Sequence, residues 1–196
     1  MSKFYFKKAR KFVDFPKNQV RANDYGEGGK YILIEGDKLA RYNECVQNGL
    51  SPTKEYVVDN NQSVKSALDL RKSKNEAFQT LEANFLSKAR QGFTYKGNVY
   101  GLDEMTVRNI DLYNGSLEKD DKIDKGNPNH QRKFPNGALL SDATGVQRNI
   151  ALNEWDDFYI EYAGAYGTLM AKRIGAENQI RLASTIAAVA AIDLTV

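Results

Sequence analysis

The stretch GFTYKGNVYGLD, residues Gly92 to Asp103, decides how the chain turns between its helices. Aromatic and β-branched residues flank the tripeptide Lys96-Gly97-Asn98, which is suited to a tight turn. We therefore predict a β-hairpin over residues 92–101, followed by a helix for which Asp103 is the N-cap. The hairpin carries no reactive group, so we expect it to hold the fold through Gly92, Phe93, Gly97, Tyr100 and Asp103.

Helical patterns lie on both sides of this hairpin. The segment from Ser63 to Arg90 contains neither Gly nor Pro, and its later apolar residues recur at helical spacing: Phe78, Leu81, Phe85 and Ala89. Gly92 is a typical C-terminal stop for such a helix. The helix that follows the hairpin is predicted to end at Gly115. The polar stretch 116–142 is then predicted to be a long loop, a feature that is often functional or wrapped on a partner.

A second strand and a long helix are expected in the C-terminal part. We predict a strand over residues 146–152 that pairs with the hairpin in a small sheet. Asn153 is the expected cap of the next helix. We favour one continuous rod to residue 192, with or without a bend, and a separate helix after Gly175 is the alternative that stays open. Its broad apolar stripe consists of Trp155, Phe158, Tyr159, Tyr162, Tyr166, Leu169 and Met170.

Small residues form a second stripe on this helix, at strict four-residue spacing: Ala163, Gly167, Ala171 and Gly175. Such a stripe lets another backbone come close, although each Gly lowers helix propensity. Two interpretations remain open, namely close packing inside the domain or contact with another subunit. We predict a contact surface made of Trp155, Tyr159, Tyr162, Ala163, Tyr166, Gly167, Ala171 and Gly175.

The N-terminal part is predicted to be rich in strands. Aromatic and β-branched runs in residues 4–15 and 30–37 indicate strands, a short helix follows to Gly49, and residues 56–58 indicate another strand. The polar segment 59–63 is a candidate boundary. We therefore expect an α+β protein, with a β-rich attachment module over 1–60 and a mainly helical domain with long helices and a small hairpin over 61–196.

Composition limits the chemistry that this chain can perform. The 196 residues have a formal net charge of +3 and include one cysteine, Cys45, and one histidine, His130. One of each excludes an internal disulfide and a Cys/His metal site. The stretch 26–31 lacks the glycine spacing of a phosphate loop, and the stretch 120–127 would place Ile123 and Lys125 at calcium-ligand positions, where neither can serve. A metal site made of carboxylates alone stays open. We therefore expect no cofactor, no metal and no specific nucleic acid partner.

One pair of carboxylates keeps an enzymatic alternative open. Asp157 and Glu161 are one helical turn apart, and paired carboxylates can hydrolyse glycosidic bonds. Acidic residues near a helix N-terminus are also expected from the helix dipole alone.

The longest apolar run, 186–192, is too short to span a bilayer, and the basic start lacks an apolar leader core. We expect a soluble protein made in the cytoplasm.

The order of these elements resembles an uncharacterised domain family found in bacteriophage tail and tail-fibre-associated proteins. The resemblance covers about Val64 to Leu194. Its most specific parts are Gly92-Phe93, Gly97, Tyr100 and Asp103, together with the Ile/Ala-rich end at 186–192. This sequence departs from the family pattern in a longer stretch at 117–135 and in the position of Trp155. The family offers no catalytic residues that could be carried over.

The resemblance implies a non-enzymatic virion protein of the tail or baseplate region, made in the host cytoplasm. Its partners would be other phage structural proteins, such as tail-fibre, baseplate, ring or portal-proximal proteins, and further copies in a homo-oligomer. The first sixty residues would be an attachment module. Two alternatives stay open: an assembly chaperone for tail fibres that is absent from the particle, and a small cell-envelope hydrolase.

Overall fold

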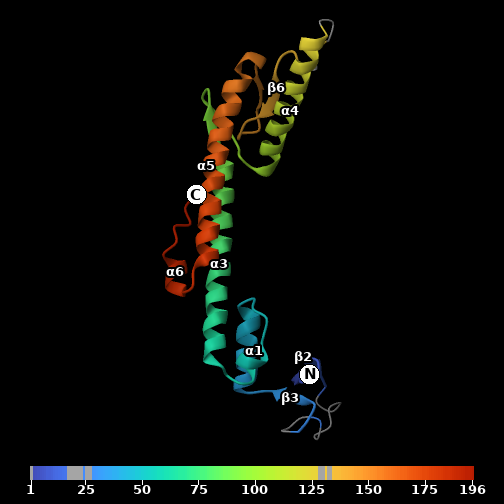
Figure 1. The fold of residues 1–196 in the computed structure, drawn as a ribbon, viewed down its shortest axis with the longest axis vertical. Helices are drawn as coiled ribbons and strands as arrows, with labels where there is room; N and C mark the ends of the chain where they lie inside the picture. The colour runs from blue at the N-terminus through green and yellow to red at the C-terminus, as the bar shows by residue number, and fades with distance from the viewer. Residues whose placement is uncertain (1, 17–23, 25–27, 128–130, 132–133) are drawn as a thin grey trace. The chain divides into compact units, whose positions relative to one another are not determined.

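Residues 2–16, 24, 28–127, 131 and 134–196 are described by a computed structural model, drawn in Figure 1. The chain forms two compact units. The first comprises residues 1–76 with 184–190, and the second comprises residues 77–183 with 191–196. The division falls within a long helix, α3 (Gln62–Gln91), and not at the expected boundary after residue 60. The expected α+β class is confirmed, since strands dominate the start of the chain and long helices the rest.

A three-stranded antiparallel sheet begins the first unit. Its strands are β1 (Ser2–Phe6), β2 (Lys11–Phe15) and β3 (Tyr31–Ile34), in the order β2-β1-β3. Tyr5 of the central strand packs with Ile34 and Val57 in a small core. The strands predicted in this region are confirmed, because alternating aromatic and β-branched residues fit a half-buried sheet.

Helices, not a further strand, complete the first unit. They are α1 (Asp37–Gln47), α2 (Lys54–Val57), the first half of α3, and α6 (Ile186–Ala190). The strand predicted at 56–58 is wrong, because Thr53 caps α2 by accepting a hydrogen bond from the Tyr56 backbone N–H at 3.3 Å. The Tyr56 hydroxyl donates to the Glu44 carboxylate, and this hydrogen bond lowers the pKa of Glu44.

The second unit contains the predicted hairpin. Strands β4 (Phe93–Tyr95) and β5 (Asn98–Tyr100) pair antiparallel, with Phe93 opposite Tyr100. Gly92 ends α3 with a φ of 65°, and a side chain there would meet the Tyr100 carbonyl oxygen at 1.8 Å. A glycine is therefore required on two grounds, the left-handed backbone and the close approach of the next strand.

Helix α4 (Glu104–Gly126) begins as predicted and ends much later than predicted. The Asp103 carboxylate accepts hydrogen bonds from the backbone N–H groups of Met105 and Thr106, both at 3.1 Å, which confirms the N-cap. The helix continues through Gly115, because Leu117 and Asp120 are buried on its inner side. The residues after Gly115 are mostly polar, so the sequence pattern did not indicate this buried face.

The expected loop over 116–142 is therefore wrong at both ends, and its residues 128–130 and 132–133 lie outside the described residues. Its last residues form strand β6 (Ala138–Ser141), which pairs antiparallel with β7 (Gln147–Ile150). The expected pairing of β7 with the hairpin is also wrong, because the two hairpins form separate two-stranded sheets. They are joined by a backbone hydrogen bond from the Ala143 N–H to the Val99 carbonyl oxygen at 2.7 Å.

Asp142 organises the turn between β6 and β7. Its carboxylate accepts hydrogen bonds from the Thr144 hydroxyl at 2.6 Å, the Thr144 and Val146 N–H groups at 2.9 and 3.0 Å, and Arg148 Nε at 3.0 Å. The side-chain bond from Thr144 and the bond from Arg148 hold the pKa of Asp142 well below its usual range.

Helix α5 (Trp155–Leu182) follows a 3-10 turn, η3 (Leu152–Glu154). The expected Asn153 cap is wrong, because Glu154 occupies the cap position and makes no side-chain cap hydrogen bond. The expected continuous rod is also wrong. Ala183 adopts an extended backbone, and the Thr185 hydroxyl accepts from the Ala188 N–H at 3.1 Å to cap a separate helix, α6 (Ile186–Ala190).

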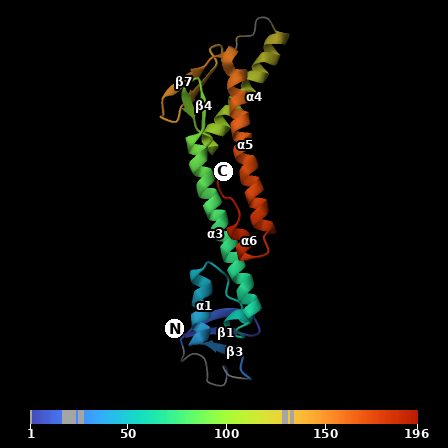
Figure 2. The same cartoon turned by 90° about the vertical axis from the view of Figure 1, so that its left-hand side faces the viewer.

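Within the second unit, α5 lies beside the second half of α3, as Figures 1 and 2 show. Arg173 joins the two helices. Its guanidinium forms an ion pair with Glu82 at 2.6 Å and lies 4.4 Å from the centre of the Phe85 ring. The packed side of α5 is thereby fixed, and its opposite side faces away from this core.

Candidate functional site

The inner side of α5 forms the aromatic core of the second unit. Phe158 is fully buried and contacts the hairpin rings of Phe93, Tyr95 and Tyr100, with ring centroids 5.1–5.4 Å apart. These pairs meet at tilted or edge-to-face angles, which aromatic rings favour. The hairpin therefore packs on α5 through its aromatic rings, in agreement with the structural role expected for Phe93 and Tyr100.

Trp155 and Tyr162 belong to this core and not to a contact surface, which corrects their expected role. Each is only 3% exposed. The Trp155 indole N–H donates to Asn114 Oδ1 at 3.0 Å, and the Tyr162 hydroxyl donates to Asp111 Oδ1 at 3.2 Å. Burial and the nearby Asp111 carboxylate raise the pKa of Tyr162. Their polar atoms form hydrogen bonds within the chain, so neither side chain is accessible for contact with a partner protein.

The other predicted contact residues lie elsewhere on α5. Tyr159 and Tyr166 are half-buried at the edge of the core, where Tyr166 stacks on Tyr162 with a centroid distance of 5.9 Å. The small-residue stripe is exposed along its whole length. It is flanked by two large apolar side chains that the stripe pattern missed, Ile160 at 67% and Ile174 at 50% exposure.

We call the exposed apolar side of this helix the outer face of α5; it consists of Ile160, Ala163, Gly167, Ala171, Ile174 and Gly175. No described atom would come within 4 Å of a Cβ placed on Gly167 or Gly175, apart from the helix's own backbone and chain neighbours. Of the two interpretations left open by the sequence, close packing inside the domain is therefore wrong for these glycines. None of the described residues packs on Gly167 or Gly175 from outside the helix.

Asp157 and Glu161, the carboxylates of the hydrolase alternative, are both exposed on α5. Neither belongs to the hollow lined by Pro135 and Asn149 or to the smaller one lined by Asn114 and Trp155. A catalytic acid in a glycosidase needs surroundings that raise its pKa, such as burial in an apolar pocket. Both carboxylates are exposed to solvent and are not buried in such a pocket.

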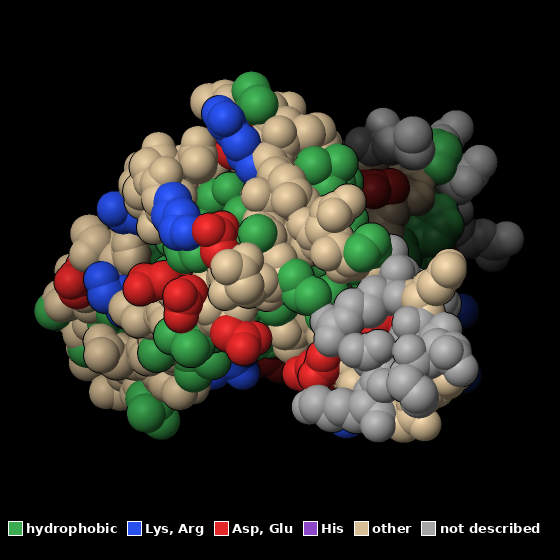
Figure 3. Space-filling view, turned by 90° about the horizontal axis from the view of Figure 1, so that it is seen from above, with side chains coloured by type: hydrophobic (Ala, Val, Ile, Leu, Met, Phe, Trp, Pro, Cys, Tyr) green, Lys and Arg blue, Asp and Glu red, His purple; other side chains and the backbone are tan. Residues whose placement is uncertain are grey.

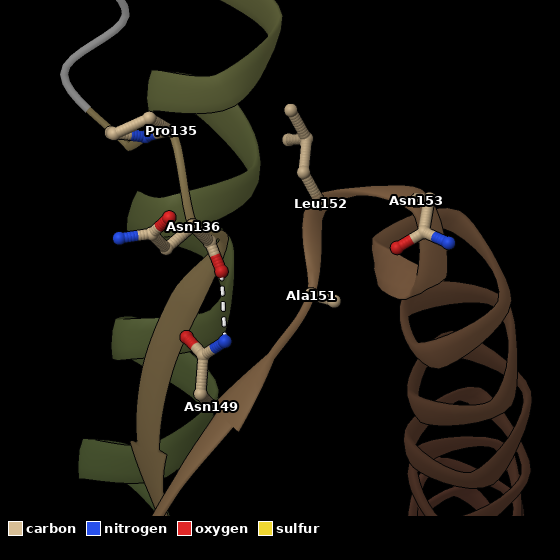
Figure 4. A pocket seen from close by; sticks show the side chains of 6 residues that line it. All are labelled: Pro135, Asn136, Asn149, Ala151, Leu152 and Asn153. Atoms are coloured by element: carbon tan, nitrogen blue, oxygen red, sulfur yellow. Dashed lines mark hydrogen bonds between the residues drawn. The ribbon is translucent and has the colours of Figure 1, made fainter.

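The larger hollow, shown in Figure 4, is open to solvent and lies beside β6, β7 and the start of α5. Its six lining residues are Pro135, Asn136, Asn149, Ala151, Leu152 and Asn153. The Asn149 side chain donates to the Asn136 carbonyl oxygen at 2.8 Å and so braces the open end of the β6–β7 hairpin. Carboxamides do not titrate, so this lining offers hydrogen bonds without an acid, a base or a nucleophile.

Charges are mixed on the face that Figure 3 displays. Acidic and basic side chains are interspersed there, with hydrophobic side chains in small groups between them. A mixed field of this kind does not attract a polyanion such as nucleic acid over a wide area. Among the described residues, no three His, Cys, Asp or Glu side chains gather as metal ligands would.

Across the described ranges, the helices are too short or too polar to reach from one side of a membrane to the other.

Sequence reasoning found the glycine and alanine positions of the outer face but missed Ile160 and Ile174. The detectable signal was their spacing from Gly167, since each lies seven residues from it on the same side of the helix.

Comparison of the chain with protein-family models, with curated proteins and with solved structures gave no match to any of them.

Proposed function

We propose that this chain is a non-enzymatic structural protein of a bacteriophage virion, located in the tail or baseplate region. It connects or anchors tail fibres or ring proteins by packing helices against neighbouring subunits. The observation that carries this proposal is the outer face of α5, an apolar surface on the side of the helix opposite to its buried core side.

A surface helix of a complete globular unit normally presents polar residues to water on its outer side. The outer face of α5 departs from this rule over four helical turns, from Ile160 to Gly175. Exposed apolar surface of this extent is typical of protein contact sites. The mode of action that fits is association, since a helix can bury such a face only against another protein surface.

The phage assignment rests on the resemblance carried by the hairpin. Gly92 permits the close approach of strand β5, and Asp103 caps α4. These positions support a shared architecture with the tail-associated family. Neighbouring tail proteins and further copies of this chain are the partners that the proposal names.

Mass spectrometry of gradient-purified particles tests this function. The phage whose genome encodes the chain would be purified, and the peptides of this chain would be quantified against known tail proteins and against an infected-cell protein that is not packaged. We expect the chain to remain in a constant ratio to the tail proteins through successive purification steps. A chain that is needed for tail assembly but disappears from finished particles is an assembly chaperone, and the structural role is then refuted.

A further inference from the structure

We infer that the outer face of α5 pairs with the outer face of α5 in a second copy of this chain, with the two helices antiparallel. This inference deepens the proposed function and rests on it in taking the outer face as a contact surface. Three observations carry it: the cost of the glycines, the order of large and small side chains along the helix, and the order of the charges.

Neither backbone conformation nor packing against the described residues requires a glycine at three positions of α5. Gly164, Gly167 and Gly175 have no positive φ, and a Cβ on any of them would meet nothing within 4 Å. Each Gly in the interior of a helix is unfavourable relative to Ala. A close backbone from outside the chain is what makes the missing side chain useful, because small residues let two helix axes approach closely.

The order of side-chain sizes favours a reversed second copy. Gly167 and Ala171 lie equally far from Leu169, so a two-fold axis at the level of Leu169 places them opposite each other. The same axis places Ile174 of one copy beside Ala163 of the other, at nearly equal distances from Leu169. A large side chain then fills the space left by a small one. Parallel copies would instead stack Ile174 on Ile174 and leave a gap at Gly167.

The charges along α5 follow the same order. The helix begins with Asp156 and Asp157 and carries Lys172 and Arg181 toward its end, and all four are exposed. Antiparallel copies place Asp156 of one chain at the level of Arg181 of the other, on the same side of the seam. Parallel copies place the acidic ends together. Arg181 also lies 3.8 Å from Glu177 of its own chain, so the new partner would extend an existing charge pair.

The mass of the full chain in solution is the first test. Size-exclusion chromatography with light scattering should give twice the 22.0 kDa of one chain at micromolar concentration and above. Gly167→Leu should weaken the dimer about tenfold or more, since a Leu holds the helices apart. The same change raises helix propensity, so the monomer stays folded. Asn109→Leu, at an exposed position of α4 instead of α5, is the matched control and should leave the dimer unchanged.

A charge exchange tests the orientation. Asp156→Lys alone and Arg181→Asp alone should each weaken the dimer about two- to tenfold, and the double variant should restore it, because the exchanged pair is again of opposite charge. A strict monomer at all concentrations, or a dimer indifferent to Gly167→Leu, overturns the pairing. A dimer that the double variant does not restore overturns the antiparallel arrangement. A monomer found within particles refutes this pairing alone, whereas a dimer absent from particles refutes the virion function alone.

Discussion

Replacing Gly92 by alanine should unfold the second unit at a much lower denaturant concentration, and a matched glycine in the same hairpin provides the scale. Gly92 and Gly97 both have positive φ values, 65° and 79°. A Cβ at Gly97 would meet nothing within 4 Å, whereas a Cβ at Gly92 would lie 1.8 Å from the Tyr100 carbonyl oxygen. The two substitutions therefore share the backbone strain and differ in the steric overlap.

The magnitude follows from that difference. Left-handed backbone at a residue with a side chain costs about 1–2 kcal/mol, which is the whole expected effect of Gly97→Ala. At Gly92 the oxygen must also retreat by about 1 Å to reach the 3.0 Å at which such contacts begin to occur. That shift opens the β4–β5 ladder and separates Phe93 from Phe158, so we expect a total destabilisation of about 3–5 kcal/mol.

Urea unfolding followed by the fluorescence of Trp155 is the appropriate assay, because Trp155 is the only tryptophan and is buried beside Phe158 in the second unit. With a slope of about 1–3 kcal/mol per molar urea, Gly92→Ala should lower the midpoint by roughly 1 M or more relative to Gly97→Ala. Equal midpoints for the two variants would refute the argument that close approach of the strand, and not backbone conformation alone, requires this glycine.

Three further predictions concern the same fold. Phe158→Ala should lower the free energy of unfolding by about 3–5 kcal/mol, against about 0.5 kcal/mol or less for Met105→Ala, which is 74% exposed; equal losses in urea titrations would contradict the aromatic core. Asp103→Ala should cost about 1 kcal/mol, and Asp103→Asn should keep most of the cap; thermal unfolding measures both, and an unchanged midpoint for the alanine variant would remove the cap's role. The lowered pKa of Asp142 stabilises the fold above the ordinary carboxyl pKa of about 3.9, and this contribution is lost as pH falls from there toward the folded-state pKa; the urea midpoint of Asp142→Asn should therefore change less between pH 5 and pH 3 than that of the original chain, and equal changes would argue against this site.

Local signals were sufficient wherever a residue acts on its own neighbours. The β4–β5 hairpin, the stop at Gly92 and the cap at Asp103 follow from backbone preferences and hydrogen bonds within a few residues. The same reasoning was wrong about the 116–142 stretch, since one buried face carried by Leu117 and Asp120 keeps α4 helical among polar residues. It was wrong about Asn153 as well, because a 3-10 turn takes the place of the expected cap.

For the candidate site, the sequence by itself determined that α5 is a long helix with a stripe of small residues, because helical spacing alone places Ala163, Gly167, Ala171 and Gly175 on one side. It could not determine which side is buried, since both sides of α5 carry apolar residues. Only the tertiary structure decided this. The rings of the hairpin and the Arg173 contact with α3 cover the aromatic side, whereas no described atom outside the helix packs on Gly167 or Gly175.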